Sequence, residues 1–336
     1  MLPFAKTTNF PIDDFNKTFL NLGMVQGTLQ MLPVSGDVVV LMVNKKLVAE
    51  AGVTIPWTLD PKSSQWTYDE FVKVTRRLTV DANGKRGDEV GFDKSNIGVY
   101  GAAIDPTWWA VYVPAILAEG GQFVSDDLTK SLLNSKEGIA AIEKLTRPVL
   151  DGHWAPLSYL STAGSPFPAG KAAIFDTVRG GIPSFRNEMK DDWDVVHFYR
   201  GAQKRVTGMG TQGFALSGST RIANDAWSFL GYMYSEDGMK MITSQYGAVP
   251  VEQRFYNATW WKNLPPPPAN NDVFTQAFDY GTLPPRLPFY TTGEFTRAIS
   301  DGFTGIELKQ TTPDKVAASV SEALQKWLKL NKPQAQ

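Results

Sequence analysis

Two adjacent indoles are the side chains of this sequence best placed to do chemistry. Trp108 and Trp109 follow Pro106, where a loop is expected to become a helix, and Tyr112 comes about one turn later. Adjacent residues cannot share one helical face, so at most one of the two indoles can lie wholly in a core. The other could face a cleft, where an indole packs well against the C–H face of a sugar. Core or interface packing of both indoles is the alternative.

The chain has few side chains suited to nucleophilic or metal-dependent catalysis. It has no cysteine, and its two histidines are His153 and His197. A zinc site or a Ser–His pair is therefore disfavoured, and we interpret His153 as a loop histidine. Carboxylates occur as sequence neighbours, as at Asp126 and Asp127, which points them apart rather than across a scissile bond. Two carboxylates from distant positions would still allow a glycosidase.

Two glycine-containing patterns resemble ligand-binding motifs but lack the right context. Gly208–Gly213 reads GMGTQG, like a dinucleotide-binding fingerprint. That fingerprint needs a helix after it, whereas a β-like segment follows here, so we interpret the pattern as a turn or as a backbone approach to another ligand. Asp81–Lys85 resembles half of a calcium loop, and we interpret it as an Asn-Gly hairpin turn.

The elements around these motifs alternate between strand and helix patterns. Leu29–Val43 is apolar and β-rich around a break at Ser35–Gly36, and the helix after it should stop at Gly52. Thr67 opens a capping box on a helix that runs to about Leu78. Further helices are predicted from Pro106 to Gly120–Gly121, after a cap at Asn134, and from Thr312–Pro313 onward. Strands separated by helices favour an α/β fold.

Length and charge limit the classes of protein further. The chain has 336 residues, enough for about two domains. Its 33 basic and 34 acidic residues give a net charge of −1 without a long basic block, so no nucleic-acid partner is predicted. No stretch approaches the ~20 apolar residues of a membrane helix, and Met1–Lys6 lacks the apolar run of a signal peptide.

Seven short motifs occur in order along nearly the whole chain. The first runs from Leu32 to Leu47 and continues at Ala51–Val53, in the pattern LP…NK-x-L…AG. The others are Trp66–Phe71 with Leu78–Thr79, Ala118–Gly121, Leu133–Ser135, Phe167–Ala173, Ala226–Leu230 and Gly247–Pro250. In this order the motifs resemble those of the family-1 extracellular solute-binding proteins of sugar ABC transporters.

The resemblance implies an α/β, two-lobe periplasmic-binding-protein-like fold of type II, with a sugar held between the lobes. Lobe one would comprise residues 1–40 and 212–285, and lobe two residues 45–207 and 290–330. Hinge crossings would lie near residues 38–44, 207–212 and 285–290. In the family the first motif lies roughly a hundred residues into the mature protein, whereas here it begins at Leu32. We therefore expect lobe one to be incomplete and to lack an N-terminal segment.

The resemblance also assigns cleft residues on the first crossing and around the indoles. Ser35 and Asp37 would hydrogen-bond sugar hydroxyls. Trp108 and Trp109 fall where family members often place an aromatic that stacks on the sugar.

Further cleft candidates come from the later motifs. Gly210 and Thr211 lie at the usual glycine-rich backbone contact, and Tyr290 lies in a late loop. Arg179 stands in a segment where the family commonly carries a glycine and an aromatic. Its planar donor fork in the cleft would suit an acidic or unusual saccharide.

The function implied is reversible capture of a sugar or oligosaccharide, without catalysis or a cofactor, for the permease subunits of an ABC importer. The protein would be periplasmic, or extracellular and membrane-anchored, and a monomer. The alternatives are a glycoside-processing enzyme, or the same fold with a peptide, polyamine or phosphorylated polyol as ligand.

Overall fold

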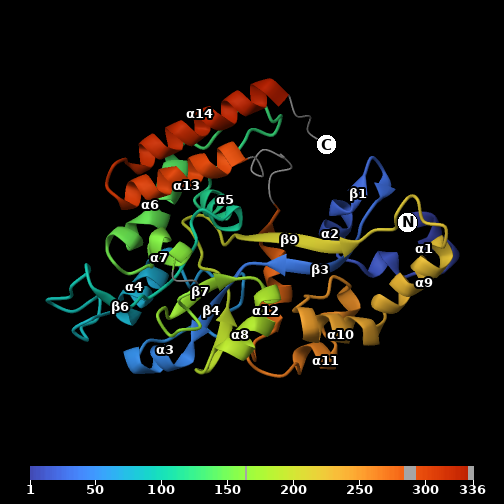
Figure 1. The fold of residues 1–336 in the computed structure, drawn as a ribbon, viewed down its shortest axis with the longest axis horizontal. Coiled ribbons are helices and arrows are strands. Elements are labelled where there is room, and N and C mark those ends of the chain that lie inside the picture. Colours follow the sequence, from blue (N-terminus) through green and yellow to red (C-terminus); the bar gives the residue numbers. More distant parts are fainter. Residues whose placement is uncertain (163–164, 284–292, 332–336) are drawn as a thin grey trace.

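The computed structural model describes residues 1–162, 165–283 and 293–331 (Figure 1). The strands are β1 (Met24–Val25), β2 (Thr28–Leu29), β3 (Leu32–Val38), β4 (Val40–Asn44), β5 (Val80–Asp81), β6 (Ile97–Val99), β7 (Ile174–Thr177), β8 (Trp193–Val196), β9 (Thr207–Phe214) and β10 (Gly281–Thr282). The helices are α1 (Leu2–Thr7), α2 (Lys17–Leu22), α3 (Lys45–Ala51), α4 (Tyr68–Leu78), α5 (Trp109–Ala118), α6 (Lys136–Leu150), α7 (Leu157–Thr162), α8 (Ile182–Glu188), α9 (Ala223–Met233), α10 (Glu236–Tyr246), α11 (Thr259–Lys262), α12 (Asp272–Gln276), α13 (Gly293–Glu307) and α14 (Pro313–Asn331). Short 3-10 helices cover Ile12–Asp14, Arg179–Gly181, Gln253–Phe255 and Ala277–Asp279.

Two three-stranded sheets meet in the middle of the molecule. One has the order β10-β9-β3 and the other β7-β4-β8. The chain passes from the first to the second through Val39, whose amide donates to the Gly208 carbonyl at 2.9 Å. In Figure 1, β3 and β9 lie side by side across the centre, with α3–α7, α13 and α14 on one side and α1, α2 and α9–α11 on the other. The crossing at Val39 thus joins the two sheets.

The predicted break at Ser35–Gly36 is wrong, because β3 continues through both residues. They pair with Gln212 and Thr211 in β9, and the register is irregular between Pro33 and Ser35. Gly36 is needed for packing: a Cβ there would lie 2.5 Å from the ring of Phe278. The strand is interrupted at Val39 instead.

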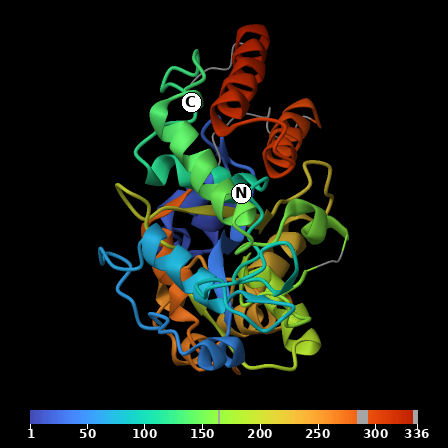
Figure 2. The ribbon, with the colours of Figure 1, turned by 90° about the vertical axis from the view of Figure 1, so that its left-hand side faces the viewer.

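Side chains of β4 and of Val39 before it alternate between two hydrophobic cores. Val39, Leu41 and Val43 lie in core A, which also contains buried residues of α4–α6, α13 and α14. Val40 and Met42 lie in core B, which contains buried residues of α2 and α9–α12. A strand buried on both faces reads as a continuous apolar run, which explains the pattern in the sequence. Figure 2 shows α13 and α14 beside α6 at one end, with α3 at the other.

Core B includes residues that the sequence placed in lobe two. Phe167, Ile182, Phe185, Trp193 and Val195 pack there with residues from 209–277. One face of the β7-β4-β8 sheet is thus covered jointly by α8 and by helices of the predicted lobe one. The limits of the two lobes stay a prediction. They did not lead us to expect that residues 167–195 would share a core with residues 209–277.

Most local predictions hold. The capping box of α4 is confirmed, since the Glu70 amide donates to Thr67 Oγ1 at 3.3 Å and the Thr67 amide to Glu70 Oε2 at 2.7 Å. α3 ends before Gly52, which has a φ of +64°. The cap predicted at Asn134 is wrong by one residue: Ser135 Oγ accepts from the amide of the third helical residue at 3.1 Å. Ser135 is the last residue with extended backbone, so its hydroxyl meets the free amides.

The Gly208–Gly213 pattern is part of a strand, so its interpretation as a turn is wrong, whereas the Asn-Gly turn is confirmed. β9 runs through all of Gly208–Gly213, and no helix start follows it. At Gly208 a Cβ would lie 2.5 Å from the Cβ of Ala110, so this glycine lets β9 touch α5. The Asn-Gly hairpin turn is confirmed by Gly84, with a φ of +81° and an amide that donates to the Asp81 carbonyl at 3.0 Å.

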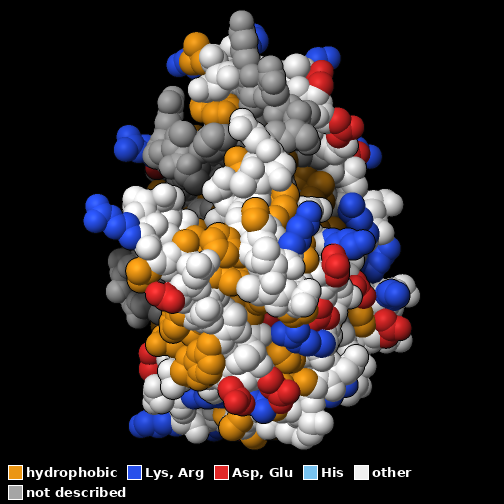
Figure 3. All heavy atoms as spheres, turned by 90° about the vertical axis from the view of Figure 1, so that its right-hand side faces the viewer, with side chains coloured by type: hydrophobic (Ala, Val, Ile, Leu, Met, Phe, Trp, Pro, Cys, Tyr) orange, Lys and Arg blue, Asp and Glu red, His pale blue; other side chains and the backbone are white. Residues whose placement is uncertain are grey.

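One end of the molecule exposes apolar side chains. Ile222, Phe229 and Tyr232, at the start and along the outer side of α9, are more than half exposed. Figure 3 shows this end, where patches of apolar side chains lie between charged ones. Such patches are typical of surfaces on which another chain packs. Among the described residues, no helix is both long and apolar enough to cross a membrane.

Candidate ligand-binding site

β3 and β9 bring four of the predicted residues together. Asp37 pairs with Gly210, and Thr211 Oγ1 donates to the Ser35 carbonyl at 2.7 Å. Ser35 Oγ donates to Asp37 Oδ1 at 3.2 Å and accepts from the Val249 amide at 3.1 Å. We call this group, together with Gln212, the Asp37 cluster. The paired strands position it at the junction of the sheets.

The groups of the Asp37 cluster differ in what they can offer a ligand. Ser35 is only 5% exposed, and its hydroxyl already has two partners, so it holds the strand in place. Gln212 is exposed and donates to Asp37 Oδ2 at 3.0 Å. Burial raises the pKa of Asp37, and hydrogen bonds from Gln212 and Ser35 partly oppose this shift. A Cβ at Gly210 would meet nothing within 4 Å, so a ligand can approach the backbone there.

A cavity of about 350 Å³, which we call the Trp108 hollow, lies between the start of α5 and the end of β7. Its lining residues are Asp105, Trp108, Leu160, Ser165, Phe175, Asp176, Thr177 and Val178. A second cavity of about 450 Å³ shares Asp105 and Leu160 with it and continues to α7 and α13. We call this second cavity the α13 hollow.

Hydrogen bonds and strand pairing fix the position of the Trp108 hollow. Asp105 Oδ1 accepts from the Thr107 amide at 2.9 Å and from its hydroxyl at 2.7 Å, which shapes the loop before Trp108. Thr177 pairs with Val40, next to the point where β3 passes into β4. The hollow therefore lies beside the junction of the two sheets.

The two indoles have different surroundings. Trp108 is the N-cap residue of α5 and lines the Trp108 hollow, whereas Trp109 is absent from its lining. Both are partly buried against core A, and Tyr112 lies inside it. Trp108 is thus the indole that a ligand in the hollow would touch.

Asp176 is a site residue that the sequence analysis missed. It is 4% exposed, Oδ1 accepts from the Asp105 amide at 3.3 Å, and Oδ2 has no hydrogen-bond partner. Burial, and then the charge of Asp105, raise the pKa of Asp176 to about 8. The available signal was a carboxylate in the otherwise apolar strand that follows the Phe167–Ala173 motif.

Asp176→Asn tests this buried acid. The folded protein holds a proton on Asp176 between its unfolded pKa near 3.8 and its folded pKa of about 8, whereas the unfolded chain does not. The free energy of unfolding of the wild type therefore falls as the pH rises through that window, by up to about 1.4 kcal/mol per pH unit. In urea unfolding at several pH values, the free energy of unfolding of the variant should rise relative to that of the wild type from pH ~5 to pH ~8. A constant difference would contradict the raised pKa.

Arg179 does not occupy the predicted cleft position. It is 1% exposed, and Nη1 donates to the carbonyls of Thr243 and Ala248 at 3.1 and 3.2 Å. Nε and Nη2 donate to Asn271 Oδ1 at 3.4 and 3.3 Å, and the guanidinium lies 5.0 Å from the ring centroid of Trp261. Its donors point into the protein because α10 and the loop before α12 pack over this segment. Tyr290 lies outside the described residues.

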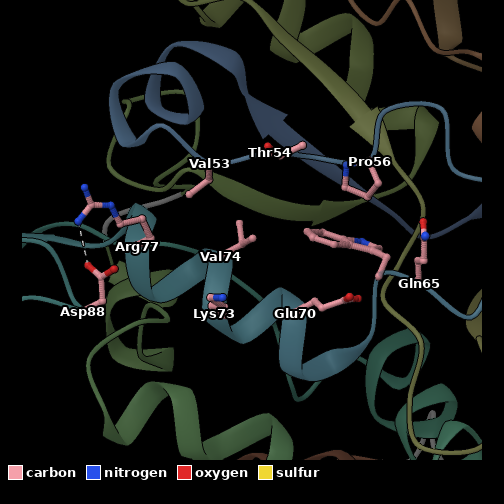
Figure 4. A pocket seen from close by; sticks show the side chains of 10 residues that line it. Val53, Thr54, Pro56, Gln65, Glu70, Lys73, Val74, Arg77 and Asp88 are labelled. Atoms are coloured by element: carbon pink, nitrogen blue, oxygen red, sulfur yellow. Dashed lines mark hydrogen bonds and ion pairs between the residues drawn. The ribbon is translucent and has the colours of Figure 1, made fainter.

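A third cavity, of about 450 Å³, lies on the outer side of α4 (Figure 4). It contains none of the predicted ligand residues. Two of its charged lining residues, Arg77 and Asp88, form an ion pair with each other at 3.1 Å. Across the described residues, no group of three or more acidic or histidine side chains could hold a metal ion.

Comparison with known proteins identifies the family and the fold of this chain. The family model described as bacterial extracellular solute-binding protein matches residues 3–269. No curated protein matches the chain in sequence. The ABC substrate-binding protein Lmo0181 from Listeria monocytogenes, in complex with cycloalternan, has a TM-score of 0.80 and 20% identity, over 97% of this chain and 78% of that one. Maltose-bound MalE3 of T. maritima has a TM-score of 0.74 and 16% identity, over 97% and 79%. The two-lobe binding-protein fold is confirmed, and the chain belongs to the bacterial extracellular solute-binding protein family.

Proposed function

We propose that this protein captures a sugar or oligosaccharide reversibly and hands it, unmodified, to the permease of an ABC importer. The observation that carries the proposal is the Trp108 hollow, where an accessible indole lies beside two carboxylates at the junction of the sheets. Sugars combine apolar C–H faces with hydroxyls. An aromatic face with a few convergent polar groups is the matching surface.

The comparisons support the sugar class. The Listeria protein was solved with cycloalternan and the T. maritima protein with maltose, and a cyclo/maltodextrin-binding protein with maltotetraose has a TM-score of 0.73. These proteins share the fold at low sequence identity, so their ligands suggest probes for this chain.

The Asp37 cluster supplies the second wall of the proposed site. Asp37 lies on β3, and Gly210 and Gln212 lie on the paired strand β9. β3 passes through Val39 into β4, which pairs with β7 beside the Trp108 hollow. Ser35 and Thr211 act by joining these two strands. Rotation about the crossing at Val39 would bring the Asp37 cluster toward Trp108, and a ligand that contacts both sides would stabilise the closed form.

The finer properties follow from the same proposal. The protein acts as a monomer without catalysis, outside the cytoplasm, either free in a periplasm or anchored to a membrane. The lobes are those of residues 1–40 with 212–285, and of residues 45–207 with 290–330.

Calorimetric titration with maltose, maltotetraose and cycloalternan tests the function. We expect saturable binding of at least one sugar at a stoichiometry near one, because one composite site binds it. Chromatography of the recovered sugar should show it intact. Turnover of the sugar would indicate a glycoside-processing enzyme, and absence of binding across a wider panel of saccharides would contradict the proposal.

A further inference from the structure

The two hollows beside Trp108 are lined by acidic side chains. Asp105 and Asp176 line the Trp108 hollow, and Asp105 and Glu307 line the α13 hollow. Within the described part of the chain, neither lining includes a lysine or an arginine. Concave surfaces of low polarity focus such a field, so the hollows favour a cation over an anion.

Asp176 provides an independent sign of a missing partner. Its side chain is buried, with only 4% of the residue exposed to solvent, and its Oδ2 has no hydrogen-bond partner. Buried carboxylate oxygens nearly always have a donor, and leaving one without a donor costs stability. Asp176 lines the Trp108 hollow, so a ligand bound there approaches the side chain that lacks this partner.

The remaining lining fits the rest of a sugar. Hydroxyl-bearing residues of the two hollows are Thr107, Ser158, Ser161, Ser165, Ser300 and Thr304. They match sugar hydroxyls, and the Trp108 indole attracts both C–H groups and cations through its face. An acidic sugar or a phosphorylated polyol would meet Asp105 and Glu307 here, with no basic side chain in either lining to balance its charge.

We propose that the natural ligand carries a basic nitrogen, as an amino sugar or an amino-substituted oligosaccharide does, with its ammonium group held by Asp176 and Asp105. This inference rests on the proposed function and narrows its ligand class. An ammonium group donates three hydrogen bonds and needs acceptors on several sides. Asp176 Oδ2 and Asp105 supply acceptors from β7 and from the loop before α5. In the free protein burial raises the pKa of Asp176 to about 8, so its carboxyl holds a proton at pH 6. A bound ammonium group would lower this pKa, and binding would release the proton to solvent.

Matched sugars that differ in charge test this inference. The probes are chitotriose, its fully N-acetylated form and cellotriose, titrated calorimetrically at a pH of about 6, where a sugar amine is charged. We expect chitotriose to bind at least about tenfold more tightly than its two neutral counterparts. The preference should shrink to about threefold or less in Asp176→Asn and in Asp105→Asn, which keeps the acceptor for Thr107, and it should fall as salt is raised.

Two controls, a charge change far from the hollows and an amine that is not a sugar, distinguish failure of this inference from failure of the sugar-binding function. Asp225→Asn, on the exposed first turn of α9, removes one negative charge far from the hollows and should leave the preference unchanged. Equal or tighter binding of the neutral trimers would overturn the inference and leave the sugar-binding function standing. Binding of spermidine without any saccharide would overturn the function and keep the preference for a cation. If Asp176→Asn does not fold, Asp105→Asn and the salt dependence decide the question.

Discussion

Trp108→Ala is expected to weaken sugar binding by about 30-fold, equivalent to about 2 kcal/mol. The indole is the large apolar surface of the Trp108 hollow, and it is only partly buried by core A. Its loss removes the face on which a sugar ring packs and leaves the carboxylates of the hollow in place. Calorimetric titration with the tightest-binding sugar of the panel measures the effect.

Trp260→Ala is the matched control for this substitution. Trp260 is also a partly buried indole, but it packs against core B and lines none of the three hollows described above. Circular dichroism should show that both variants keep their secondary structure. Equal affinity of Trp108→Ala and the wild type would remove the indole from the site and contradict the assignment of the Trp108 hollow as the sugar site.

Arg179→Met should lower the free energy of unfolding by about 3–5 kcal/mol. Methionine fills much of the volume but leaves the carbonyls of Thr243 and Ala248 and the side-chain oxygen of Asn271 without their donor. Each buried acceptor without a donor costs about 1–3 kcal/mol, and the stacking of the guanidinium on Trp261 is lost as well. Urea unfolding followed by far-ultraviolet circular dichroism measures the change.

Arg221→Met removes the same charge from an exposed position before α9 and should change stability by less than about 0.5 kcal/mol. This control separates the role of the buried guanidinium from a change in net charge. A variant of Arg179 that keeps its stability but loses sugar affinity would return this residue to the ligand site, as the sequence first predicted.

Local sequence patterns determined where several helices begin and end, and they indicated the family to which the chain belongs. Thr67 and Glu70 lie three residues apart, and the capping box needs only that spacing. α3 ends at Gly52 because glycine adopts the left-handed backbone conformation at the lowest energetic cost. The order of short motifs resembled one family, and the match over residues 3–269 confirms it. Position after Pro106 also marked Trp108, because a helix start leaves a side chain free to face a cavity.

Tertiary structure decided which polar side chains face the cavity. Arg179 and Asp176 lie three residues apart near one strand end, and nothing local says that the carboxylate lines the hollow while the guanidinium enters the protein. The partners of Arg179 lie between residues 243 and 271, so its burial depends on how α10 and the loop before α12 pack over this segment. Periodicity fixes which face of its own element a side chain occupies, whereas long-range packing determines whether that face meets a core, a partner or a cavity.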